Sequence, residues 1–109
     1  MSLAEHCYRL TGKFPRDELF GLTSQIRRAA ASIPANIAEG HGRESTGNFV
    51  QNLRISQGSL KELETHLLLA ERVGILNREE TGPTVERCES VGKMIRALIR
   101  SLQQKASSR

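Results

Sequence analysis

Residues 45–74, STGNFVQNLRISQGSLKELETHLLLAERVG, decide the fold of this chain. Their apolar and small residues recur in alternating steps of four and three, the spacing that lines one face of an α-helix. This seam consists of Phe49, Leu53, Ser56, Leu60, Leu63, Leu67 and Ala70. Ser45 or Thr46 is suited to cap the start of the helix, and Gly74 is suited to end it. The stretch therefore predicts one long helix that packs along its seam.

The preceding segment has the same period but contains a proline. Its seam consists of Leu22, Ile26, Ala29, Ile33 and Ile37, and we expect the helix to begin between Asp17 and Thr23. Pro34 removes one backbone hydrogen bond and crowds the carbonyl of Ala30, typically at a cost of about 3 kcal/mol, so we expect a bend there. The alanines around it form a small-residue surface that lets a neighbouring helix approach closely.

The two ends of the chain add two further helical patterns. The C-terminal seam consists of Cys88, Val91, Ile95, Leu98 and Leu102. The sequence allows two starts for this helix, because Asn77 with Glu80 matches a capping box whereas Pro83 suits a first helical position. We expect helix from Asn77 or Arg78, with a bend near Pro83. Residues 3–11 form a short first helix with Leu3, Cys7 and Leu10 on one side.

Four helices with short connections predict antiparallel neighbours, and hence an all-α, up-down-up-down four-helix bundle. A length of 109 residues indicates one domain, so we assign residues 1–109 to a single bundle. We expect Met1–Leu3 to be a cloning remnant, which would place the natural start upstream. We expect Lys105–Arg109 to be a flexible tail.

The composition argues against several classes of protein. No apolar run approaches the roughly 18 residues of a membrane span, and the N-terminus lacks the apolar core of a signal peptide. We therefore expect a cytoplasmic protein that does not contact a membrane. Cys7 and Cys88 form no CxxC pair, so they predict neither a disulfide framework nor a zinc site. Both lie on apolar seams, and we expect them to be small buried hydrophobic residues.

Residues 32–45, SIPANIAEGHGRES, raise the question of catalysis. Glu39, His41 and Glu44 could supply a general acid and base, and Glu39 with His41 could begin a metal site. The stretch lacks the spacing and the third ligand that a metal helix pair needs. The chain also lacks a Walker-type phosphate loop and a nucleophile elbow. We therefore expect no enzymatic activity, no metal and no cofactor.

The net charge of +4 is concentrated near the C-terminus. From Val91 onward there is no Asp or Glu, and the basic residues are Lys93, Arg96, Arg100, Lys105 and Arg109. Such a face fits a polyanionic partner such as nucleic acid, while the alternative is a solvated helix face. Because aromatic residues make up only 4% of the chain, strong base stacking is not expected.

Two stretches resemble a known family. Residues 20–45, FGLTSQIRRAAASIPANIAEGHGRES, and 49–76, FVQNLRISQGSLKELETHLLLAERVGIL, closely resemble the four-helix-bundle proteins encoded within intervening sequences of bacterial 23S ribosomal RNA genes. These are also called S23 ribosomal proteins. The chain departs from the family in its shorter first helix, which lacks a Trp-containing start. It also departs at Gly82–Pro83, which interrupts the fourth helix.

The resemblance implies a left-handed antiparallel bundle that assembles into a homopentameric, barrel-like ring. The chain is also similar to the accessory variability protein of diversity-generating retroelements. This likeness implies a basic pentamer that binds RNA or DNA and has a protein partner such as a reverse transcriptase. The family members are not known to be enzymes. The resemblance therefore favours a binding protein.

Two functional hypotheses follow. The first is a nucleic-acid-binding oligomer, with RNA favoured over DNA, whose basic side chains contact phosphates largely independently of sequence. The candidate contacts are Arg27, Arg28, Arg43, Arg54, Lys93, Arg96 and Arg100. For Arg27 and Arg28 the alternative is an ion pair with an acidic residue of another subunit. The second hypothesis is a protein-interaction scaffold without direct nucleic-acid binding.

A separate group of residues forms a candidate signature of structure and assembly. It consists of Pro34, Asn36, Glu39, Gly40 and Gly42. We expect the two glycines to provide the backbone freedom that ends the helix and makes the turn. Asn36 and Glu39 are expected to cap a neighbouring helix or to reach another subunit.

Overall fold

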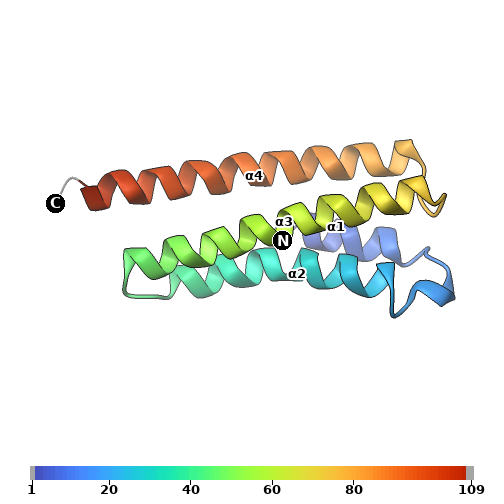
Figure 1. The fold of residues 1–109 in the computed structure, drawn as a ribbon, viewed down its shortest axis with the longest axis horizontal. Coiled ribbons are helices and arrows are strands. Elements are labelled where there is room, and N and C mark those ends of the chain that lie inside the picture. The colour runs from blue at the N-terminus through green and yellow to red at the C-terminus, as the bar shows by residue number, and fades with distance from the viewer. Residues whose placement is uncertain (1, 108–109) are drawn as a thin grey trace.

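The computed structural model describes residues 2–107, which form an elongated bundle of 52 × 23 × 18 Å (Figure 1). The helices are α1 (Ser2–Thr11), α2 (Leu22–His41), α3 (Thr46–Arg72) and α4 (Arg78–Ser107). A short 3-10 helix, η1 (Arg16–Glu18), lies between α1 and α2. Each helix packs on the next, and α1 also contacts α4. The predicted all-α four-helix bundle is confirmed.

The side chains at the helix starts fix the element boundaries. Ser45 Oγ accepts a hydrogen bond from the Asn48 amide at 3.2 Å and so caps α3. At the start of α4 the Asn77 amide donates to Glu80 Oε1 at 3.1 Å, and the Glu80 amide donates to Asn77 Oδ1 at 2.8 Å. This reciprocal pair is the predicted capping box, so the alternative start at Pro83 is wrong. Gly74 follows α3 with a φ of +83°.

α4 continues through Ser107 and so includes the first part of the expected tail. Met1, Ser108 and Arg109 lie outside the described residues. Leu3, within the expected cloning remnant, is buried in the core.

The core follows the predicted seams. Ile26, Leu53, Leu63, Leu67 and Ile95 are almost completely buried and come from three different helices. α1 adds Leu3, Cys7 and Leu10 to this cluster. Because α1 is short, it lies beside only part of the bundle, whereas α4 runs past the turn that joins α2 and α3 (Figure 1). The end of the bundle near the α2–α3 turn is therefore built from α2, α3 and α4.

α2 and α3 approach each other closely at Gly40. A Cβ atom at this position would lie 2.8 Å from Asn52 Cβ and 2.8 Å from Phe49 Cδ1. Gly40 itself is helical and buried, and Gly42 has a φ of −80°. The expectation that these two glycines supply backbone freedom at the turn is therefore wrong. Gly40 is required because a side chain would force the two helices apart.

A series of polar contacts also joins α2 to α3 along the segment around Pro34. Asn52 Nδ2 donates to Asn36 Oδ1 at 3.2 Å, and Asn36 Nδ2 donates back to the carbonyl of Ser32 at 2.9 Å. Ser56 Oγ donates to the Ile33 carbonyl at 3.0 Å in a buried position. These bonds pair polar groups that would otherwise be costly inside an aliphatic interface. Asn36 therefore bonds to α3 of the same chain, where a helix cap or a contact with another subunit was expected.

Glu39 and Pro34 complete the candidate signature. Glu39 Oε1 pairs with Arg43 Nη2 at 2.8 Å, one turn along the chain. α2 is continuous from Leu22 to His41 with Pro34 inside it. Glu39 therefore has a partner within its own chain, and Pro34 does not end α2.

We predict that Gly40→Ala destabilises the protein by about 1–3 kcal/mol, because the new methyl group overpacks the α2–α3 contact. Gly58→Ala, on α3, is the matched control, since a Cβ atom there would meet nothing within 4 Å. The control should be stabilised by roughly 0.5–1 kcal/mol through helix propensity. Urea unfolding followed by circular dichroism measures both. Equal stability of the two variants would contradict the close approach at Gly40.

The two cysteines occupy the contact region of α1 and α4. Cys7 and Cys88 have no exposed surface, and both are free thiols. Burial raises the pKa of Cys7 to about 11. Burial, followed by the nearby Cys7, Glu64 and Glu89, raises the pKa of Cys88 to about 12. The prediction of small buried residues is confirmed.

These raised pKa values predict thiols that are slow to react in the native protein. At about pH 8 we expect dithionitrobenzoate to modify neither cysteine rapidly, and both after unfolding in guanidinium. The sign also predicts a loss of stability as the pH rises from about 9 to about 11, where unfolded thiols ionise and native Cys7 resists. Rapid modification of the native protein would contradict this burial.

Candidate nucleic-acid interface

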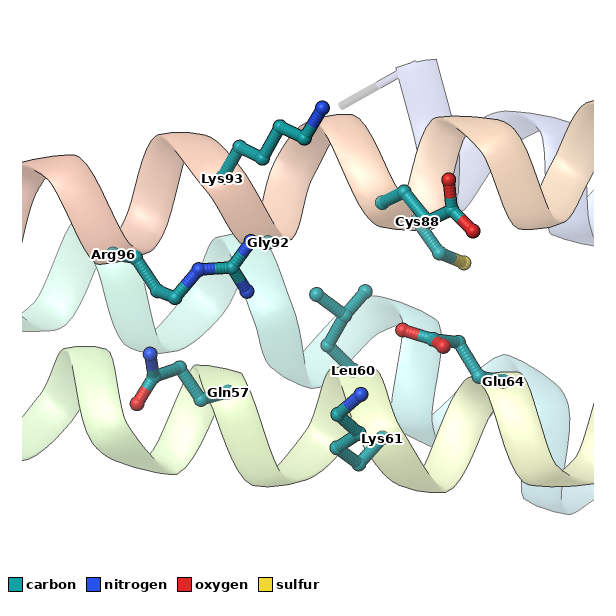
Figure 2. Close-up of a pocket in the computed structure, with 9 residues that line it drawn as sticks. Gln57, Leu60, Lys61, Glu64, Cys88, Gly92, Lys93 and Arg96 are labelled. Carbon is teal, nitrogen blue, oxygen red and sulfur yellow. The ribbon is translucent and has the colours of Figure 1, made fainter.

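Two adjoining recesses run along the surface between α3 and α4, and together they form what we call the α3–α4 groove. The larger has a volume of about 570 Å³ and contains Leu60, Glu64, Gly92 and Arg96, among others (Figure 2). The smaller has a volume of about 320 Å³. Its lining residues are Arg54, Gln57, Arg96, Ile99, Arg100 and Gln103. Gln57 and Arg96 border both recesses, so the groove is continuous.

Helical spacing brings these side chains into two facing rows. On α3, residues 54, 57, 61 and 64 follow steps of three and four, and on α4 residues 89, 93, 96, 100 and 103 do the same. Each row lies beside the buried seam of its helix. Between the rows, a Cβ on Gly92 would be 3.2 Å from Leu60 Cδ2 and 3.3 Å from Arg96 Nη1. Because Gly92 has no side chain, Leu60 of α3 and the guanidinium of Arg96 both fit against the α4 backbone at this point.

The smaller recess is purely cationic. Arg54, Arg96 and Arg100 border it from the two helices, and no acidic residue lines it. Within residues 2–107, none of these three guanidinium groups has a hydrogen bond or an ion pair. Each is exposed at the surface. Fifteen donor N–H groups are thus available to a ligand at one place, since each arginine carries about five.

The larger recess has mixed chemistry. Figure 2 shows Gln57 and Arg96 at one end, the Glu64 carboxylate at the other, and Leu60 between them. Glu89 also lines this recess. Lys93 contributes to its edge, but its side chain extends away from α3 (Figure 2). The groove therefore changes from positive to mixed charge along its length.

The structure brings four of the seven predicted contact residues to this groove, namely Arg54, Lys93, Arg96 and Arg100. The other three lie elsewhere. The Arg27 guanidinium stacks over the Tyr8 ring at 4.9 Å, and its Nε donates to Thr11 Oγ1 at 2.8 Å. These contacts fasten α2 to α1. Arg28 bonds to Gln25 on its own helix, and Arg43 pairs with Glu39.

Several residues that line the groove were not predicted from the sequence as contact residues. They are Gln57, Leu60, Lys61, Glu64, Glu89, Gly92, Ile99 and Gln103. The sequence feature that could have identified them is the helical spacing of the polar residues beside the two seams. That spacing would have grouped Gln57 and Glu64 with Arg54, and Glu89 and Gln103 with Arg96.

His41, one of the residues considered for catalysis, contacts α3. The His41 ring lies edge-on to Phe49, with ring centroids 5.8 Å apart. Over residues 2–107 no group of three or more His, Cys, Asp or Glu side chains could hold a metal ion. In the same part of the chain, no helix is both long and apolar enough to cross a membrane.

Comparisons with known proteins agree with this architecture. The sequence profile of the family described as 23S rRNA-intervening sequence protein matches residues 1–97. A crystal structure of a protein of unknown function from the S23 ribosomal protein family of Bacteroides thetaiotaomicron is similar, with a TM-score of 0.80 and 25% identity. The match covers 90% of this chain and 92% of that chain. No curated protein matches the sequence. The chain therefore belongs to the 23S rRNA-intervening sequence protein family.

Proposed function

We propose that this protein is a non-enzymatic, homo-oligomeric bundle that binds RNA by contacting phosphates in the α3–α4 groove. The observation that carries the proposal is the meeting of Arg54, Arg96 and Arg100 at one recess without an acidic partner. A guanidinium group presents a planar fork of donors that matches the oxygens of a phosphate. Three such groups side by side favour a chain of phosphates over a single carboxylate.

The distribution of charge supports a polyanion. α4 carries no acidic residue beyond Glu89, so its C-terminal half adds only positive charge to the groove. The groove has no aromatic side chain for base stacking. Binding should then depend on phosphates more than on base identity. Three contacts per protomer predict a roughly 20-fold loss of affinity between about 50 and about 200 mM salt.

Assembly would strengthen such binding. The family resemblance implies a pentamer, and large exposed apolar side chains favour association with further copies. Phe20 is 92% exposed in the connection before α2, and Val73 is 58% exposed at the end of α3. Several grooves on one ring would raise the effective concentration of each phosphate contact. Weak sites could thereby give tight overall binding.

We predict that Arg96→Glu with Arg100→Glu reduces RNA affinity at least about 100-fold, because two charge-assisted contacts are lost and two repulsions are added. The matched control is Arg16→Glu with Arg72→Glu, which makes the same change in net charge at exposed positions outside the groove. Fluorescence anisotropy with a labelled RNA, at low and high salt, measures both double variants. Helix content should be unchanged in each.

Two results would contradict the assignment. If both double variants lose affinity equally, net charge rather than the groove would govern binding. If the wild type shows no binding to RNA at low salt, the alternative of a protein-interaction scaffold would replace the proposal. The same surface would then be open to an acidic protein partner.

A further inference from the structure

We propose that the α3–α4 groove holds the 3′ end of an RNA strand. The terminal nucleoside would lie in the larger recess, and the phosphates that precede it would lie against Arg54, Arg96 and Arg100. This inference rests on the proposed function and specifies which part of the RNA the groove selects. It follows from the order of charges along the groove, from the chemistry of its floor and from its length.

The two ends of the groove differ in charge. The smaller recess has three arginines and no carboxylate. The larger recess ends at Glu64 and Glu89, one from each helix. Neither carboxylate has a hydrogen bond or an ion pair among residues 2–107. Both act electrostatically on Cys88 at the floor, where they add to the effect of burial on its pKa. Lys61 and Lys93 also line the larger recess, so the two carboxylates offset their charge there. A phosphate backbone is therefore attracted at the arginine end and gains little at the carboxylate end.

A strand that enters over the arginines therefore gains nothing by placing further phosphates beside the carboxylates, so the end of a strand suits this place. The group that suits the stopping point is neutral and donates hydrogen bonds. The 3′-terminal ribose has two adjacent free hydroxyls, and carboxylate oxygens accept hydrogen bonds from ribose hydroxyls. A natural 5′ end would instead bring its own phosphates towards Glu64 and Glu89. The polarity of the groove thus selects the 3′ end.

The floor of the larger recess suits a nucleoside. Leu60 lies between the arginine end and the carboxylate end (Figure 2), and Gly92 faces it from α4 without a side chain. Leu60 is only 4% exposed and Gly92 is buried, so these two residues close the floor beneath a bound nucleoside, while the Gln57 amide can bond to the edge of its base. A volume of about 570 Å³ is within the range of small-molecule sites.

The length of the groove also fits. Arg54 and Glu64 are separated by ten residues of α3, which corresponds to a rise of roughly 15 Å. This distance accommodates one nucleoside and the phosphates next to it. A free ribonucleotide has the same ribose hydroxyls and 5′-phosphate, so the test has to separate a strand end from an isolated nucleotide.

The first experiment compares three RNA oligonucleotides of one sequence, each labelled at the 5′ end. Their 3′ ends carry free 2′- and 3′-hydroxyls, a 3′-phosphate, or a 2′,3′-dideoxyribose. Anisotropy at moderate salt should give about tenfold weaker binding for the two altered ends, because each loses hydrogen bonds to a carboxylate and one adds repulsion. Uridine 5′-monophosphate should compete only at concentrations about 100-fold higher or more, since it offers one phosphate to three arginines.

The second experiment uses variants of the carboxylates. Glu64→Gln with Glu89→Gln should abolish the preference for a free 3′ end over a 3′-phosphate, whatever its effect on overall affinity. Glu79→Gln with Glu86→Gln is the matched control, because both residues are exposed on α4 and neither lines the groove. The control should keep the preference. The readout is a ratio of affinities, so a general gain from removing negative charge does not obscure it.

The outcomes separate this inference from the proposed function. Equal, salt-dependent binding of all three oligonucleotides would overturn the 3′-end assignment and leave RNA binding in place. Competition by uridine monophosphate at the same concentration as the strand would overturn it in favour of a free ribonucleotide. Failure of all oligonucleotides to bind at low salt would overturn both proposals.

Discussion

The close contact between α2 and α3 is the constraint on which the other features depend. Gly40 lets the helices meet at the end near their turn, and hydrogen bonds from Asn36, Asn52 and Ser56 continue the contact. One face of α3 packs on α2, and a neighbouring face packs on α4. α4 extends past the turn (Figure 1), and two recesses lie along its line of contact with α3. The groove follows this second line of contact.

Much of the bundle could be predicted from the sequence because apolar period and cap chemistry are local properties. The seams, the Ser45 cap and the Asn77–Glu80 box are all read from residues three or four apart. The role of Gly40 could not be predicted in this way. Its requirement comes from Phe49 and Asn52 on another helix, and a glycine near a turn has the same local signal as a helix stop.

The candidate site was only partly predictable for a similar reason. Counting charges located the basic row on α4, but it could not tell engaged arginines from free ones. Arg27 and Arg43 are occupied by Tyr8, Thr11 and Glu39, whereas Arg54 and Arg96 have no partner within residues 2–107. The carboxylates of the groove were missed because they do not add to a basic patch. Their position makes the two ends of the groove differ in charge.

The central claim is that an oligomer of this bundle binds RNA through phosphate contacts. Light scattering on the purified protein, alone and with a structured RNA at low and high salt, tests it most directly. The account predicts a particle of five times 12.1 kDa that gains the mass of RNA at low salt and loses it at high salt. A particle that ignores RNA at low salt would contradict the claim of binding, and a monomer would contradict the claim of assembly.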